Sequence, residues 1–297
     1  MRYNVYEGKM KFYYFGGHFH DNFLKQLEDC SFDGVLFTYN PLQGDFFTLA
    51  ARENNKTEKI KYMLAIRAHT LSPQYLCMIN HSFNSFMPNR LEINLISGHI
   101  KENEKDFGGL IGDITDLSSG EDRGKYLIKY LEELDEMSKN PKVRVPDYFV
   151  TTTNEHVFEA VSRLNNKMII QYREYKRGHW TIHLNNEPHA GKSFDLKNKD
   201  VMISVSPIIR PTQEDIDSEF PLQQIWLPPR PGEIGGRSIM ARTSQNTDGE
   251  YFTYKEFMDF INELKSKGIN KVMLQATPWS ENKNIMEFVK KYKEINP

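Results

Sequence analysis

Short apolar runs that alternate with amphipathic stretches are the feature that most constrains the fold of this chain. Between residues 33 and 99, three such runs each end in a polar or glycine-containing turn, and the stretches between them are long enough to form helices. Parallel strands need a crossover connection, most often a helix, so this alternation predicts βα units in one parallel sheet. Barrels and open α/β sheets place ligand sites at the carboxyl ends of such strands. We therefore expect functional residues at 38–41, 67–69 and 97–99.

The same alternation continues along the whole chain. It gives eight strand candidates: residues 10–15, 33–37, 61–66, 91–96, 147–150, 167–171, 201–209 and 271–275. Eight βα units predict a (β/α)8 TIM-type barrel, and a doubly wound open sheet is the alternative. Polar and glycine-containing stretches predict insertions after strands four, six and seven, with an irregular segment over 211–250. Barrels of this size are commonly single domains, so we expect 1–297 to form one domain.

Several helix ends are marked by their residue types. Asp45 is placed to cap the helix that follows it, and Ser72-Pro73 combines a capping hydroxyl with a proline at the first helical position. Gly268 follows a helix predicted over 253–267, where a glycine C-cap is expected.

Composition narrows the class of partner. A net charge of -2 gives no electrostatic case for binding nucleic acid or an anionic membrane. The two cysteines, Cys30 and Cys77, lie in predicted helices and are expected to be buried reduced thiols. The N-terminus lacks the apolar core of a signal peptide, and no apolar run approaches the roughly 20 residues of a membrane span. These features predict a cytoplasmic protein that binds small molecules or other proteins.

A set of short sequences appears in a fairly specific order along the chain. Between Phe32 and Gly98 these are Asp-Gly-Val-Leu, Leu-Ala-Ile-Arg, Leu-Ser-Pro and Asn-Arg-Leu-Glu-Ile-Asn-Leu-Ile-Ser-Gly. Later matches are sparser: Glu121-Asp122-Arg123, Tyr148-Phe149 with the threonines after it, and Lys267-Gly268-Ile269-Asn270-Lys271-Val272-Met273-Leu274. In these sequences the chain resembles the luciferase-like family of flavin-dependent monooxygenases, which includes bacterial luciferase, and most of all its alkanesulfonate monooxygenase branch.

The resemblance implies a (β/α)8 barrel that uses FMN, reduced by a separate flavin reductase, to oxidise a small organic substrate with oxygen. It also implies a homodimer formed through helices of the early barrel. The cofactor-binding residues that it implies are Asn94, Ser97, Gly98, Arg123, Thr152 and Thr153. Of these, Thr152 and Thr153 would hold the FMN phosphate at a helix N-terminus, and from the residues alone simple capping of that helix is the alternative. Asn40 and Arg67, after strands two and three, are the candidate substrate-binding residues.

The chain departs from the family pattern at several positions. Gly124 stands where the family often has a tyrosine, and Ser204 and Ser206 occupy the positions of the arginine and histidine that serve substrate in the alkanesulfonate enzymes. A sulfonate substrate is therefore not expected. The same departures motivate a second hypothesis, a flavin-binding barrel without catalytic activity.

Three histidines after predicted strands are the catalytic candidates. His18 and His20 follow strand one, and His99 follows the predicted flavin-contacting residues; each could act on the flavin or substrate, or face solvent. His18 and His20 also form the His-x-His pair with which metal-dependent hydrolase barrels begin, which gives a third hypothesis. Such a site needs further ligands after middle strands and an aspartate after strand eight, and here those strands end in threonines, Gln171-Tyr172 and Ala276-Thr277-Pro278. No metal is therefore expected.

Overall fold

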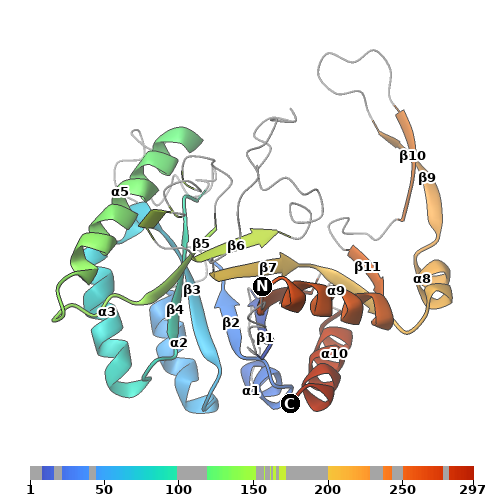
Figure 1. Ribbon diagram of the computed structural model, residues 1–297, viewed down its shortest axis with the longest axis horizontal. Helices are drawn as coiled ribbons and strands as arrows, with labels where there is room; N and C mark the ends of the chain where they lie inside the picture. Colours follow the sequence, from blue (N-terminus) through green and yellow to red (C-terminus); the bar gives the residue numbers. More distant parts are fainter. Residues whose placement is uncertain are drawn as a thin grey trace, which may run out of the picture.

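A closed barrel of eight parallel strands organises the molecule (Figure 1). The computed structural model describes residues 9–16, 22–39, 45–98, 119–151, 157, 161, 163–164, 167–171, 200–227, 237–242, 250–276 and 281–297, with backbone alone at 171, 222–227 and 237–242. In barrel order the strands are β1 (Lys11–Gly16), β12 (Lys271–Gln275), β7 (Asp200–Val205), β6 (Lys167–Gln171), β5 (Asp147–Thr151), β4 (Leu91–Ile96), β3 (Lys61–Arg67) and β2 (Gly34–Phe37). Because β2 pairs back with β1, the predicted barrel is confirmed and the open sheet is excluded.

Helices cover the outside of this barrel. They are α1 (Phe23–Asp29), α2 (Phe46–Glu53), α3 (Pro73–Phe86), α5 (Gly120–Ser138), α9 (Tyr254–Ser266) and α10 (Asn282–Ile295). Figure 1 shows α2, α3 and α5 on one side of the barrel and α9 and α10 on the other. None of the helices in the described part of the chain is long and apolar enough to cross a lipid bilayer.

The larger hydrophobic core lies between the strands and these helices. It contains the outward-facing side chains of β1, Phe12 and Tyr14, which contact aromatic residues of α10 and α1. The Phe12 and Tyr292 rings meet edge to face with centroids 5.2 Å apart. Such a pair adds about 1 kcal/mol beyond its buried area. Alternate residues of each strand therefore attach the helices to the barrel.

A smaller core fills the inside of the barrel. Its members are Tyr13, Leu36, Met63, Ala65, Phe149, Ile169, Met202 and Met273. The Tyr13 ring lies directly over Gly34 of β2, where an added Cβ would be 2.3 Å from a ring carbon. A side chain at position 34 would clash with this ring, so glycine is the residue that fits there.

Helix ends follow the predicted chemistry. The Asp45 carboxylate accepts the backbone N–H groups of Phe47 and Thr48, and the Ser72 hydroxyl accepts that of Tyr75. Gly268 follows α9 with φ of +80°, a conformation that glycine adopts without steric cost. Both cysteines are free thiols, and Cys77 is buried as expected while Cys30 is half-buried.

The segment after β7 differs from the prediction. β7 ends at Val205, and β8 (Pro207–Arg210) pairs with β11 (Glu250–Thr253) in a separate two-stranded sheet, so the predicted strand over 201–209 is wrong beyond Val205. Residues 211–250 are not irregular throughout, because they contain α8 (Gln213–Glu219) and an antiparallel pair, β9 (Leu222–Leu227) and β10 (Arg237–Arg242). Thr212 and Asp215 form a capping box at the start of α8, and this residue pattern could have predicted the helix.

Arg210 attaches this insertion to the barrel. Its guanidinium donates to both oxygens of Glu219 in α8 at 2.6 Å, and to both oxygens of Glu281 at 2.8 and 2.9 Å. Hydrogen bonds from Arg210 therefore join α8 to the residue that precedes α10. The hydrogen bonds to Glu219 and Glu281 raise the pKa of Arg210, so the guanidinium stays charged.

Candidate active site at the carboxyl ends of the strands

The carboxyl ends of β3, β4 and β5 bring several predicted site residues to one level. The strand register pairs Arg67 with Ile96, and Ile96 with Thr151. Because all barrel strands run in the same direction, the residues that follow them meet at one rim, which we call the mouth of the barrel. Arg67, Asn94, Ser97 and Gly98 all lie at this rim, where they were predicted.

Asn94 is a buried amide held by a neighbouring strand. Its side chain is 5% exposed, and its Oδ1 accepts a hydrogen bond of 2.8 Å from the Thr151 hydroxyl. Because the amide oxygen is turned to Thr151, the amide N–H₂ is on the opposite side of the group and is a donor. Thr151 was not among the predicted site residues, since nothing in its sequence context distinguishes it from the threonines that follow it.

Gly98 is the point at which two arginines converge. Its φ is +70°, and a Cβ there would be 2.7 Å from the side chain of Arg67. The carbonyl oxygen of Gly98 accepts a hydrogen bond of 2.8 Å from Arg123 Nε. Glycine is therefore required at this position for two reasons, the left-handed backbone and the close approach of Arg67.

These two arginines make the β3–β4 side of the mouth cationic. Partial burial lowers the pKa of Arg123, and the charge of Arg67 lowers it further. The Arg67 guanidinium also lies over the Tyr39 ring, 4.4 Å from its centroid, which keeps a buried cation in place. Cations at a ligand-binding rim attract anionic or electron-rich groups.

Arg123 comes from the first turn of α5. The Ser119 hydroxyl caps this helix by accepting the Asp122 backbone N–H at 3.0 Å. Arg123 lies four residues after the cap, and its backbone N–H bonds the Ser119 carbonyl. The cap thus fixes the position from which Arg123 reaches the mouth.

The opposite side of the mouth is neutral where it is described. Ser206, just after β7, donates a hydrogen bond of 3.4 Å to Gln275 at the end of β12. Among the described residues, the charged side chains that converge at the mouth are therefore on its β3–β4 side.

The remaining predicted residues lie outside the described part of the chain. They are His18, His20, His99, Asn40, Thr152 and Thr153. Within the described residues no group of three or more His, Cys, Asp or Glu side chains is arranged to hold a metal ion. Tyr39 and Thr151 were not predicted as site residues. Each contacts a residue of another strand, Arg67 and Asn94 respectively, and such contacts are not visible in the sequence.

Comparison with known proteins gives structural matches alone, since neither a protein-family model nor a curated protein sequence matches the chain. The long-chain alkane monooxygenase LadA is 12% identical with a TM-score of 0.64, covering 97% of this chain and 92% of LadA. Riboflavin lyase RcaE, solved with modified FMN and riboflavin, is 11% identical with a TM-score of 0.64 and the same coverages. The chain has the fold of these enzymes.

A third neighbour carries a different cofactor. An F420-dependent secondary alcohol dehydrogenase, solved with an F420-acetone adduct, is 11% identical with a TM-score of 0.55, covering 91% of this chain and 94% of the dehydrogenase. The predicted barrel is thus shared with enzymes whose structures contain different cofactors, a modified FMN and an F420 adduct.

Proposed function

We propose that this protein is a luciferase-like flavin-dependent monooxygenase that binds FMN at the mouth of the barrel. The observation that supports this most directly is the convergence of Arg67 and Arg123 on Gly98. It occurs on the same barrel that RcaE uses with modified FMN.

The donors at the mouth fit the chemistry of a flavin. The isoalloxazine ring has an acceptor edge of carbonyl oxygens and ring nitrogens, and its reduced form carries negative charge there. Buried cations and a fixed amide donor suit that edge, because hydrogen bonds to a charged acceptor are strong. Arg67, Arg123 and Asn94 are the described residues that offer such donors. In this proposal Thr152 and Thr153 hold the phosphate, as the family resemblance implies.

When bound, reduced flavin would supply the electrons that reduce dioxygen, with one oxygen atom passing to a small organic substrate and the other leaving as water. A separate reductase supplies the reduced flavin. The protein positions the ring through Arg67, Arg123 and Asn94 and limits access of water to it. A deazaflavin such as F420 is the alternative cofactor, because an F420-dependent enzyme shares the fold.

Binding is tested by titrating purified protein with oxidised and reduced FMN, riboflavin and F420, following fluorescence or absorbance, with metal analysis of the same sample. We expect FMN to bind, and Arg123→Gln to weaken FMN and riboflavin equally, by about tenfold. Arg144→Gln is the matched control, since Arg144 bonds Asn89 at the other end of the barrel. Thr152→Ala with Thr153→Ala should weaken FMN more than riboflavin. Stoichiometric zinc without flavin binding would overturn the proposal in favour of a hydrolase.

Catalysis is tested by oxygen consumption with reduced FMN and candidate substrates. A monooxygenase consumes oxygen in a substrate-dependent way and forms an oxygenated product. If flavin binds and no substrate changes the rate from that of free reduced flavin, the non-catalytic flavin-binding protein is the better description.

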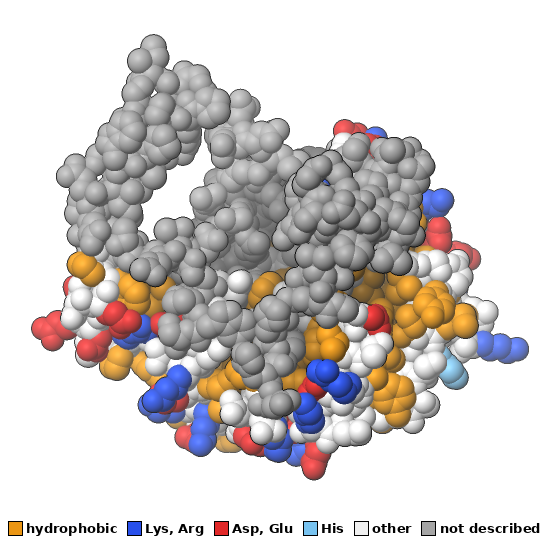
Figure 2. Space-filling view, turned by 180° about the vertical axis from the view of Figure 1, so that it is seen from behind, with side chains coloured by type: hydrophobic (Ala, Val, Ile, Leu, Met, Phe, Trp, Pro, Cys, Tyr) orange, Lys and Arg blue, Asp and Glu red, His pale blue; other side chains and the backbone are white. Residues whose placement is uncertain are grey.

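The proposed homodimer would use an apolar surface on α3 and α5. Its exposed side chains are Tyr75 (54%), Met78 (63%), Phe86 (47%) and Tyr126 (40%). Figure 2 shows hydrophobic side chains gathered on the flank to which these two helices belong. Large exposed apolar groups on adjacent helices are typical of a subunit interface. Light scattering should give a dimer that Met78→Lys dissociates, while Ile295→Lys, at an exposed apolar residue of α10, leaves it intact.

A further inference from the structure

Tyr39 is the aromatic residue against which the Arg67 guanidinium lies at the mouth. It follows β2 by two residues, and the residue before it is tied to the neighbouring strand, since the Thr38 backbone N–H donates to the Gly16 carbonyl oxygen at 3.3 Å. The Tyr39 ring is half-buried and meets the ring of Phe46, the first residue of α2, edge to face with centroids 6.3 Å apart. The ring is therefore held from two sides, by β2 and by α2.

Arg67 is held along the length of its side chain. Its stem, from Cγ to Nε, passes so close to Gly98 that a Cβ there would be 2.7 to 2.8 Å away. Its guanidinium lies 4.4 Å from the centroid of the Tyr39 ring. The Thr70 hydroxyl donates to the Arg67 carbonyl oxygen at 2.8 Å, which fixes the backbone where β3 ends. The side chain, which is 5% exposed, is thus held in one orientation.

An aromatic ring holds a cation in a different way from a carboxylate. The face of the ring attracts a guanidinium through its quadrupole and has no net charge. The ring therefore keeps the cation in place without neutralising it, whereas a carboxylate does both. Partial burial lowers the pKa of Arg123, and the charge of Arg67 lowers it further, so this charge acts on its surroundings at the mouth.

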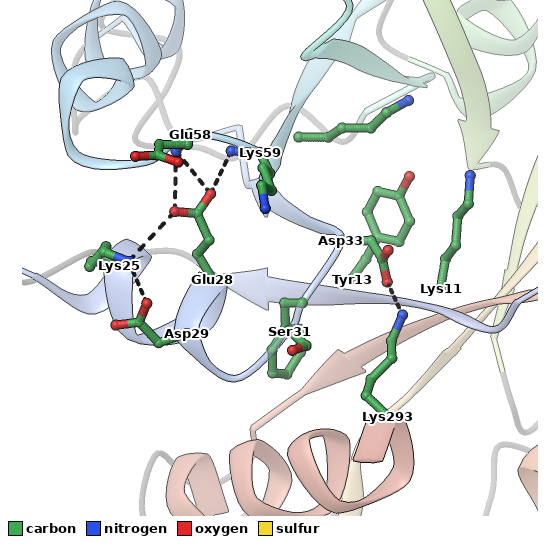
Figure 3. A pocket seen from close by; sticks show the side chains of 12 residues that line it. Lys11, Tyr13, Lys25, Glu28, Asp29, Ser31, Asp33, Glu58, Lys59 and Lys293 are labelled. Carbon is green, nitrogen blue, oxygen red and sulfur yellow. Dashed lines mark hydrogen bonds and ion pairs between the residues drawn. The ribbon is translucent and has the colours of Figure 1, made fainter. Parts of the chain in front are cut away.

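Charged side chains at the other end of the barrel are held in the second way. Figure 3 shows them around a cavity of about 500 Å³ beside the amino ends of β1 and β3. Asp33 accepts a hydrogen bond of 2.9 Å from the Lys293 ammonium, and Lys25 pairs with Asp29. Glu28 accepts backbone N–H groups of the segment that enters β3, at 2.6 to 3.1 Å. These charges are matched within the protein, and we assign no ligand to them.

We propose that Tyr39 is a positioning residue, which holds the Arg67 guanidinium where it favours the reduced, negatively charged flavin over the oxidised, neutral ring. This inference rests on the proposed function, since it needs a flavin at the mouth. A fixed positive charge stabilises a nearby anion through Coulomb attraction and acts much less on a neutral ring. The FMN phosphate is the same in both forms and does not contribute to the difference. The preference for reduced flavin therefore depends on the face of the Tyr39 ring.

The test is the ratio of the dissociation constants of oxidised and reduced FMN, measured anaerobically by titration of the full-length protein. We expect the wild type to bind reduced FMN more tightly. Tyr39→Leu removes the ring and should lower this preference about fivefold, which corresponds to about 20 mV in the two-electron reduction potential of the bound flavin. Tyr39→Phe keeps the ring face and should keep the preference.

Two further sets of variants separate the ring face from general packing. Tyr254→Leu is the matched control, because the Tyr254 ring also holds a cation, Lys291 at 5.0 Å, but packs against the outer core between α9 and α10. It should leave the ratio unchanged. Fluorinated phenylalanines at position 39 keep the shape of the ring and weaken its attraction for a cation, so they serve even if Tyr39→Leu does not fold. The preference should fall with each added fluorine.

The possible failures can be told apart. If FMN binds with the same ratio to the wild type, to Tyr39→Leu and to the fluorinated series, this inference alone is overturned. Equal losses in Tyr39→Phe and Tyr39→Leu would also overturn it, because the hydroxyl rather than the ring face would then be responsible. If the wild type binds neither form of FMN, the proposed function fails and the inference fails with it.

Discussion

In the described residues, the two ends of the barrel differ in how their charged side chains are arranged. At the amino ends of the strands, which we call the floor, lysines and carboxylates of adjacent strands form ion pairs: Lys61 with Glu92, Lys167 with Asp147 and Lys271 with Asp200. At the mouth, two arginines converge on Gly98 and the charge of one lowers the pKa of the other.

This difference suggests that the floor mainly stabilises the barrel and that the mouth mainly binds the cofactor. Charges that neutralise one another inside the molecule stabilise the closed barrel and need nothing from outside. Cations at the rim where ligands bind act instead on the anionic or electron-rich groups of a ligand. The floor should therefore respond to substitution mainly in stability, and the mouth mainly in cofactor binding.

The largest effect is expected from Lys61→Met at the floor. This change leaves the Glu92 carboxylate buried without its cation, which costs about 3 kcal/mol of unfolding free energy. Urea denaturation measures it. The folded variant should bind FMN as the wild type does.

Two controls sharpen this expectation. Lys255→Met, in an exposed pair with Asp259, should change stability little. Adding Glu92→Met to Lys61→Met should recover much of the loss, because the uncompensated charge is then gone. A Lys61→Met variant as stable as Lys255→Met would show that the floor pairs do not stabilise the barrel.

A second comparison uses two glycines with positive φ. Gly98→Ala at the mouth adds backbone strain and a clash with Arg67, whereas Gly268→Ala after α9 adds strain alone, since no atom lies within 4 Å of the added Cβ. We expect losses of about 3 and about 1 kcal/mol respectively. FMN affinity, followed by fluorescence, should fall at least tenfold for Gly98→Ala alone. Equal FMN affinity in the two variants would mean that the position of Arg67 does not matter for the cofactor.

Periodicity was enough to predict the barrel, because strands buried on both faces leave continuous apolar runs such as Tyr62 to Ile66. Helix ends were predictable wherever one residue supplies the cap, as at Asp45 and Ser72. The sheet of β8 and β11 was not, because its paired residues, such as Pro207 and Glu250, are 43 positions apart and Pro207 continues the apolar pattern of β7.

The same limit applied at the mouth. Asn94, Gly98 and Arg67 could be named from their positions after strands and from the family resemblance. Their partners could not, since the Thr151 hydroxyl and the Tyr39 ring act only across the gap between two strands.

A smaller effect at the floor depends on pH. Partial burial opposes ionisation of Glu28, but the backbone N–H groups of Lys59, Ile60 and Glu58 outweigh it and lower the pKa of Glu28. A carboxyl with a lowered pKa in the folded state stabilises the protein at pH above its unfolded value of about 4.3, and this stabilisation is lost as pH falls through the folded pKa.

Glu28→Gln should therefore lose about 1 kcal/mol at pH 7, a figure reduced for solvent screening at a partly exposed site. The difference from wild type should shrink at pH values below the folded pKa. Thermal melts from pH 2.5 to 7 measure it, and Glu58→Gln, on the same segment, should follow the wild type throughout. A constant difference across this range would mean that the carboxylate charge is not the cause.

The smallest effect is expected from Thr151→Val at the mouth. Valine keeps the shape of threonine and removes the hydroxyl that holds Asn94 Oδ1, so stability should fall by about 0.5 to 1 kcal/mol. The Asn94 amide is then free to turn, and FMN affinity should fall about threefold. Thr151→Ser, which keeps the hydroxyl, is the matched control. If valine and serine variants bind FMN equally, the orientation of Asn94 is not set through Thr151, and the cofactor would have to be held chiefly by the two arginines.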